Sequence, residues 1–129
     1  MFPSWWEKRL YGPLDWTTLI AYIIKMEIVE TPIFTSLLKK YGVNDDDYRE
    51  FQNILVAHPD FGDVISETGG ARKARMKRAG GGKSGGYRVI YYWKYQSKKI
   101  YMLLVYPKSK QENLTPEQRK ALKAILKGI

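Results

Sequence analysis

The chain has 129 residues, of which 44% are hydrophobic, and this is enough for one compact domain with a modest core. It contains no cysteine, which excludes disulfides, cysteine-ligated zinc and thiol catalysis. The formal net charge of +9 is unevenly distributed, because residues 1–68 hold six basic and eleven acidic residues whereas residues 69–129 hold sixteen basic and two acidic ones. This asymmetry predicts a cationic working face on the C-terminal half.

Residues 1–25 differ in composition from the rest, since they contain three of the four tryptophans. We interpret them as an N-terminal extension, either sequence upstream of the true start or an extra helix capped by Asp15. The main domain is then expected at residues 26–129. No apolar run is long enough to span a bilayer and the first residues do not resemble a signal peptide, so a cytoplasmic protein without a membrane partner is expected.

The first half of this domain reads as one strand followed by two helices. Residues 26–30 alternate as a short strand, and Thr31-Pro32 is a helix start with a capping hydroxyl before proline. Apolar residues at helical spacing continue to Gly42, which ends this helix. A second helix is predicted from residue 44 to His58, with three aspartates in its first turn. Residues 60–69 are expected to form a loop.

The second half changes to the alternating pattern of strands. Strands are predicted at residues 71–76, 87–95 and 99–106, with a glycine-rich loop at residues 80–86. Thr115-Pro-Glu-Gln118 is a capping box that opens a final helix. The order β-α-α-β-β-β-α predicts an α+β fold: a small antiparallel or mixed sheet, two N-terminal helices on one face and a C-terminal helix.

The strand at residues 87–95 has two contrasting sets of side chains. Alternation assigns Val89, Tyr91, Trp93 and Tyr95 to one face and Arg88, Ile90, Tyr92 and Lys94 to the other. The face without cations is predicted to be the core, and the face with Arg88 is predicted to be open.

Residues 69–111 contain twelve Lys and Arg residues and no Asp or Glu. Cations placed along strands and beside a glycine loop, with no acids to pair with, predict a surface that binds RNA or DNA. Glycines let the backbone approach a phosphate chain closely. The candidate RNA-binding residues are Arg72, Lys73, Arg75, Arg78 and Lys108.

Other motifs are explained by local structure. Gly82-Lys83-Ser84 is not a P-loop, because the first glycine of that motif would fall on Lys77 and a strand follows instead of a helix. The single histidine, His58, excludes a two-histidine ribonuclease mechanism and lacks partners for a metal site. Asp45–Asp47 suit a helix N-terminus. No cofactor or metal is expected.

Several segments, in this order and spacing, resemble the RelE/HigB toxins of bacterial type II toxin–antitoxin systems. They are Glu30-Thr-Pro-Ile-Phe-Thr35, Asp47-Tyr-Arg-Glu-Phe-Gln52, Gly62-Asp-Val-Ile65, Thr68-Gly-Gly-Ala-Arg-Lys-Ala-Arg75, Gly82-Lys83, Gly85-Gly-Tyr-Arg-Val-Ile-Tyr-Tyr92 and Asn113-Leu-Thr-Pro116. The resemblance covers Met26 to the C-terminus. It implies a RelE-like fold and a ribosome-dependent endoribonuclease that cuts mRNA in the ribosomal A site. It also implies a co-expressed antitoxin, often one with a helix-turn-helix DNA-binding domain.

The resemblance also implies roles for individual residues. Metal-independent cleavage by the RNA 2′-OH needs a base, an acid and charge stabilisation at the phosphate, and Arg88 is the best candidate for the last role. Neighbouring cations lower the pKa of a lysine, so Lys77 or Lys83 is a candidate base or acid. Tyr106 and Lys108 are the next candidates.

The chain departs from the family pattern at three positions. Ser84 stands where many relatives have arginine, Lys108-Ser-Lys110 replaces a Lys-Asn-Glu-like segment, and no tyrosine follows Tyr106. Two alternatives remain open: a ParE-like inhibitor of DNA gyrase on the same fold, and a non-enzymatic nucleic-acid-binding module. The cations between Arg72 and Arg88 favour the nuclease, because a gyrase inhibitor does not need a surface that faces phosphate.

Overall fold

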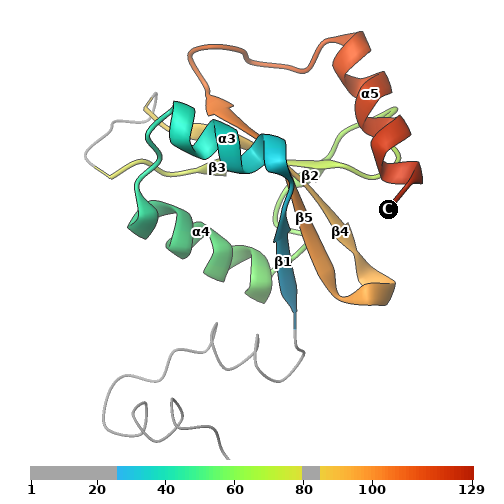
Figure 1. Ribbon diagram of the computed structural model, residues 1–129, viewed down its shortest axis with the longest axis horizontal. Helices are drawn as coiled ribbons and strands as arrows, with labels where there is room; N and C mark the ends of the chain where they lie inside the picture. Colours follow the sequence, from blue (N-terminus) through green and yellow to red (C-terminus); the bar gives the residue numbers. More distant parts are fainter. Residues whose placement is uncertain (1–25, 80–84) are drawn as a thin grey trace, which may run out of the picture.

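The computed structural model describes residues 26–79 and 85–129, and within them the predicted helices and strands follow one another in the predicted order, with one additional short strand, β2 (Figure 1). The elements are β1 (Glu27–Glu30), α3 (Pro32–Lys40), α4 (Asp45–Ala57), β2 (Asp63–Val64), β3 (Arg72–Met76), β4 (Tyr87–Lys94), the 3-10 turn η1 (Tyr95–Ser97), β5 (Lys99–Pro107) and α5 (Pro116–Lys127). The predicted helix after Asp15 and residues 80–84 of the glycine loop lie outside the described residues.

The five strands form one mixed sheet in the order β1-β5-β4-β3-β2. β1 runs parallel to β5, and the other neighbours are antiparallel. This confirms the predicted α+β fold with a mixed sheet. β2 was not predicted, because its two residues, paired with Arg72 and Lys73, are too few to show an alternating pattern.

The predicted helix starts are confirmed in atomic detail. The Thr31 hydroxyl accepts a hydrogen bond from the Phe34 N–H at 3.2 Å, and Asn44 caps α4 in the same way. In the capping box of α5, the Gln118 N–H donates to the Thr115 hydroxyl at 3.1 Å, and the Thr115 N–H donates to the Gln118 side chain at 2.9 Å. These bonds satisfy backbone donors that a helix start leaves unpaired.

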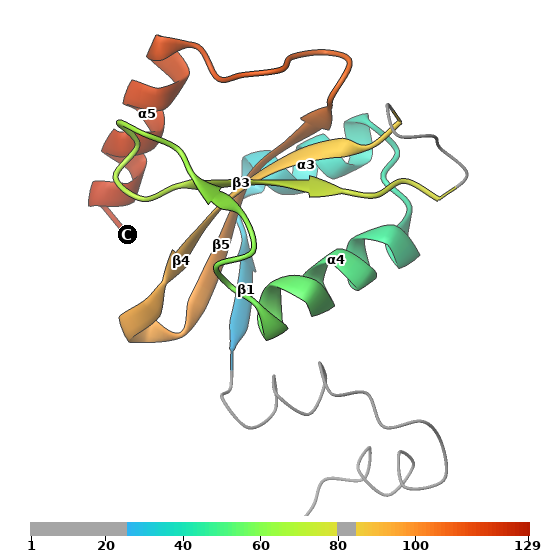
Figure 2. The same cartoon turned by 180° about the vertical axis from the view of Figure 1, so that it is seen from behind.

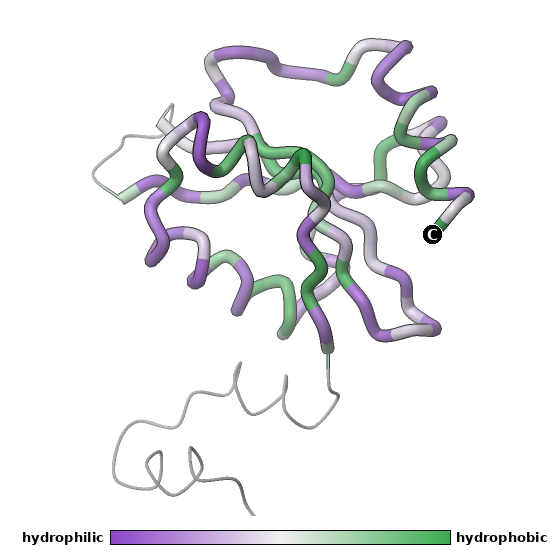
Figure 3. The backbone as a smooth tube through the Cα atoms, in the orientation of Figure 1, coloured by the Kyte–Doolittle hydropathy of each residue, from purple (hydrophilic) through white to green (hydrophobic). Residues whose placement is uncertain are grey.

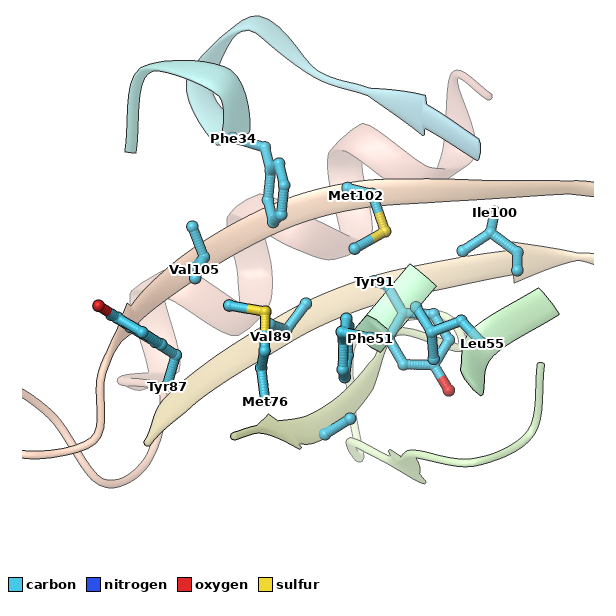
Figure 4. Close-up of a cluster of buried hydrophobic side chains, with 11 residues drawn as sticks. Phe34, Phe51, Leu55, Met76, Tyr87, Val89, Tyr91, Ile100, Met102 and Val105 are labelled. Atoms are coloured by element: carbon cyan, nitrogen blue, oxygen red, sulfur yellow. The ribbon is translucent and has the colours of Figure 1, made fainter. Parts of the chain in front are cut away.

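The larger core lies between the sheet and helices α3 and α4. Phe34 from α3 and Phe51 and Leu55 from α4 pack against the strands, and all three are almost fully buried. Figure 4 shows these side chains over Val89 and Tyr91 of β4, with Ile100, Met102 and Val105 of β5 beside them. The prediction that Val89, Tyr91 and Trp93 face the core is confirmed, since Trp93 packs against this cluster.

The sequence predicted that the opposite face of the sheet is open. In the structure, α5 partly covers this face (Figure 2). Ile90 is 1% exposed and packs in a second cluster with Leu122 and Leu126 of α5. The prediction for Tyr95 was also wrong: β4 ends at Lys94, and Tyr95 is 75% exposed in the following turn. The sheet therefore has two cores of unequal size.

A β-bulge in β5 allows this strand to place buried side chains in both cores. Ile90 pairs with Leu104 and Tyr91 pairs with Met102, so Leu103 is the extra residue of a β-bulge. Met102 and Val105 consequently both face the larger core, although three positions separate them. Leu103 and Tyr106 belong to the smaller core.

We predict that the Tyr91 hydroxyl contributes to stability, because it ties the loop after α4 to the sheet. It accepts a hydrogen bond from the Gly62 N–H at 2.7 Å and donates one to the Pro59 carbonyl at 2.8 Å. Tyr91→Phe leaves the buried Gly62 N–H without an acceptor, which costs about 1–3 kcal/mol. Urea unfolding measures the loss, and Tyr95→Phe at the exposed turn should change stability by less than about 0.5 kcal/mol. Equal effects of the two substitutions would contradict this role.

Candidate nucleic-acid interface

Three neighbouring strands align two arginines and a tyrosine across the sheet. Arg88 of β4 is paired with Arg75 of β3 on one side and with Tyr106 of β5 on the other. Directly paired residues point to the same face, with Cβ atoms about 4.5–5.5 Å apart. Because Val89 faces the larger core, these three side chains lie on the face that carries α5.

A cleft of about 350 Å³ lies on this face next to the aligned residues. Its lining consists of Val64, Ile65, Ser66, Lys73, Ile90, Tyr106, Glu112, Asn113, Leu114 and Arg119. The connection between β5 and α5 that forms its rim is largely hydrophilic (Figure 3). The cleft therefore joins an apolar floor to a rim of charged and amide side chains.

The hydroxyl of Tyr106 is held in its protonated form. Tyr106 is 9% exposed, and burial raises the pKa of its phenol, while the positive charge of Arg88 acts in the opposite direction. The electrostatic effect of Arg88 agrees with their pairing in the sheet. At neutral pH, Tyr106 can therefore donate a hydrogen bond or a proton.

Gly86 makes room for Arg75 at the start of β4. A Cβ atom at position 86 would lie 3.0 Å from the Met76 carbonyl oxygen and 3.1 Å from the Arg75 Nε. The backbone N–H of Lys108 donates to the Gly86 carbonyl at 3.2 Å. This bond positions Lys108, a further cation, beyond Tyr106 and next to the start of β4. The absence of a side chain at position 86 thus lets Arg75 lie against the backbone beside Arg88.

Arg72 does not lie with the other predicted binding residues. It precedes Ala74 and Met76 on the face of the larger core. Its guanidinium donates to the Gly62 carbonyl at 2.7 Å and to the Asp60 carbonyl at 3.3 Å. Arg72 therefore holds the loop after α4 through its Nη1 atom.

Lys77 and Arg78 follow β3 and are exposed near the start of α4. The Ala79 N–H donates to an Asp47 carboxylate oxygen at 3.2 Å, which positions this segment. Lys77 also lines a small pocket of about 80 Å³ with Asp47 and Arg75. Lys83, the remaining predicted catalytic residue, lies outside the described residues.

In the described part of the chain, Lys73, Arg75 and Arg88 of this face are not neutralised by carboxylates. Within residues 26–79 and 85–129 the ion pairs are Arg49–Asp46, Lys99–Glu27 and Arg119–Glu67. None of these pairs includes Lys73, Arg75 or Arg88. Such a surface favours an anionic ligand.

Arg119 is a cleft residue that the sequence did not reveal, because it lies in α5 outside the acid-free stretch. Its guanidinium reaches the Leu114 carbonyl at 3.3 Å, and its Nε is 3.9 Å from Glu67 Oε2. That Nε is buried and has no hydrogen-bond partner in the described part of the chain. Arg119 reaches the cleft because it lies on α5, and no local sequence pattern indicated that position.

The described ranges contain neither a metal-binding cluster nor a helix that could span a membrane. No group of three or more His, Cys, Asp or Glu residues there lies close enough together to hold a metal ion. His58 is exposed at the C-terminal end of α4, where its backbone N–H donates to the Ile54 carbonyl. None of the helices in these ranges is both long enough and apolar enough to cross a membrane.

The mixed sheet with a cationic face defines a small α+β protein suited to a polyanionic ligand. Residues 26–129 match the family described as the RelE toxin of the RelE/RelB toxin–antitoxin system. The chain belongs to this family, as its motifs predicted. It is thus a toxin of a toxin–antitoxin system, a class of protein that pairs with an antitoxin.

The coupling between Arg88 and Tyr106 predicts a change in titration. Arg88→Met removes the charge that lowers the pKa of Tyr106, so this pKa should rise further. NMR titration of labelled tyrosine ring carbons in alkaline solution measures the shift. Arg49→Met on α4 is the matched control and should leave the Tyr106 titration unchanged. An unchanged titration in Arg88→Met would show that the two side chains do not interact.

Proposed function

We propose that this protein is a ribosome-dependent endoribonuclease that cuts translated mRNA without a metal ion. The observation that carries the proposal is the alignment of Arg75, Arg88 and Tyr106 beside the cleft. This arrangement combines a phosphate-binding group with a proton donor. The family, whose members are generally endoribonucleases, supports the same reaction.

The reaction is an attack of the ribose 2′-OH on the adjacent phosphorus. A base removes the 2′-OH proton, the new O–P bond forms, and the bond to the 5′-oxygen breaks as that oxygen takes up a proton. The products are a 2′,3′-cyclic phosphate and a 5′-OH. Arg88 is assigned to the phosphate oxygens, because its planar fork matches their geometry and its charge stabilises the transition state.

Tyr106 is assigned to the proton of the leaving 5′-oxygen. Burial keeps its phenol protonated, which suits an acid better than a base. Lys77 and Lys83 are the proposed candidates for the base. Lys77 follows Arg75 by two residues, just beyond β3, and lines a small pocket with Arg75 and with Asp47 of α4.

The remaining cations of the face are assigned to the RNA backbone. Lys73 lines the cleft and is paired with Ile90, while Lys108 continues the line at the end of β5. Arg78 extends this surface beyond β3. We add Arg119 and Asn113 at the cleft rim, where an amide and a guanidinium can recognise a base edge. Arg72 is assigned to the loop it holds.

The proposal places the protein in the cytoplasm, at the A site of translating ribosomes. Its partner is a cognate antitoxin with a helix-turn-helix DNA-binding domain. The uncompensated cations favour an antitoxin that is acidic where it covers the face, because such a segment neutralises the same residues that RNA contacts.

The first test is induced expression with primer extension on a reporter mRNA. Arg88→Ala should reduce ribosome-dependent cleavage by about 10²–10³-fold, the effect of removing one group that stabilises the transition state. Arg49→Ala on α4 is the matched control and should cut normally. Growth arrest with intact mRNA and damaged DNA would instead identify a gyrase inhibitor.

A second test separates binding from chemistry. If Lys73 and Arg75 contact phosphates, then Lys73→Ala or Arg75→Ala should each reduce the slope of log affinity against log salt by about 0.7 for single-stranded RNA. Fluorescence anisotropy with an RNA oligonucleotide at several KCl concentrations measures this slope. Lys40→Ala on α3 should leave it unchanged. RNA binding without any cleavage on ribosomes would support a non-enzymatic binding module.

A further inference from the structure

An apolar groove of about 400 Å³ lies at the end of β4 away from Arg88. Its lining includes Met26, Val56, Ala57, Trp93, Tyr95 and Gln96. These residues come from the chain leading into β1, the end of α4, the end of β4 and the turn η1. Trp93 faces the larger core, so the groove is on the other side of the sheet from the cleft.

Two aromatic side chains form a prominent part of this groove. The rings of Trp93 and Tyr95 pack edge to face, with centroids 5.5 Å apart. Tyr95 is 75% exposed, the highest value among the exposed large hydrophobic residues of the described ranges. A concave apolar surface with an exposed aromatic ring is typical of a docking site.

The groove lies at the point where residues 1–25 join the domain. Met26, the first described residue, is part of its lining. Residues 1–25 contain Trp5, Trp6 and Trp16, together with the apolar run Leu19–Ile24. Such a composition differs from that of a solvated linker, which has few aromatic and aliphatic residues.

We propose that residues 1–25 of the same chain dock in this groove through their tryptophan side chains. The covalent link at Met26 keeps the segment at a high effective concentration next to the groove, which an unlinked partner lacks. Aromatic rings favour the edge-to-face contacts that Trp93 and Tyr95 already display. The proposal does not depend on RNA cleavage.

Docking at this position leaves the cationic face accessible. Arg88 and Trp93 are five residues apart on β4, about 16 Å along a strand, and they point to opposite faces. The segment is thus expected to stabilise the fold around α4 and β1 without covering the cleft.

Trp93→Phe provides a direct experiment on the full-length chain. All remaining tryptophans of this variant lie in residues 1–25, so its fluorescence reports on that segment alone. A docked segment should show blue-shifted emission and weaker acrylamide quenching than a synthetic peptide of residues 1–25. Emission identical to that of the peptide would overturn the proposal.

Tyr95→Ser in the Trp93→Phe background tests the groove itself. Because Tyr95 is exposed, its loss should not unfold the domain, and it should move the emission toward that of the peptide. Val64→Ser, at a residue that is 57% exposed on β2, is the matched control and should have no effect. No response to Tyr95→Ser, or a blue shift that appears only at high protein concentration, would contradict docking within one chain.

A second measurement keeps Trp93 in place. A photo-cross-linking amino acid at position 95 should form cross-links to residues 1–25 within the same chain, identified by mass spectrometry. Cross-links only between two chains, or only to other parts of the domain, would overturn the proposal even if Trp93→Phe disturbs the groove.

Discussion

The pairing of β4 with its two neighbours is the constraint on which both the cores and the proposed site depend. Strand side chains alternate between faces, so a shift of one residue would exchange Val89 and Tyr91 for Arg88 and Ile90 in the larger core. Burying Arg88 without a partner would cost far more than any packing gain. The register therefore secures two results at once: an apolar face for α3 and α4, and a cationic row on the face that carries α5. The bulge at Leu103 adapts β5 to this arrangement by turning both Met102 and Val105 toward the larger core.

The same register places two arginines directly opposite each other. Like charges at paired positions destabilise a sheet, and no ion pair within the described residues involves Arg75 or Arg88. Such a conflict between local stability and residue choice is typical of functional sites. An RNA phosphate between the two guanidinium groups would relieve their repulsion, so ligand binding and local stability are linked. An acidic antitoxin segment on this face would have the same effect.

Local signals in the sequence predicted most of the fold, and long-range contacts account for what they missed. Thr31, Asn44 and Thr115 identified the helix starts because a cap involves only a few neighbouring residues. Alternation identified β4 and the orientation of Arg88. The covering of Ile90 by α5 depends on how distant segments pack, which no local pattern contains. For the same reason, the prediction from charge placed Arg72 and Lys73 in one set of binding residues, although their side chains point to opposite faces. The same prediction omitted Arg119 of α5, which lines the cleft.

The location of Tyr106 bears on how the chemistry is divided among residues. The chain has no tyrosine after Tyr106. Tyr106 is near the end of β5, in the sheet itself and opposite Arg88, so its position follows from strand pairing. A group on a strand is held more rigidly than one on a connecting segment, and a protonated phenol beside a guanidinium suits a phosphate whose leaving oxygen needs a proton. In the proposed reaction the aligned pair Arg88 and Tyr106 would supply both charge stabilisation and the acid, and only the base would come from the lysines beyond β3.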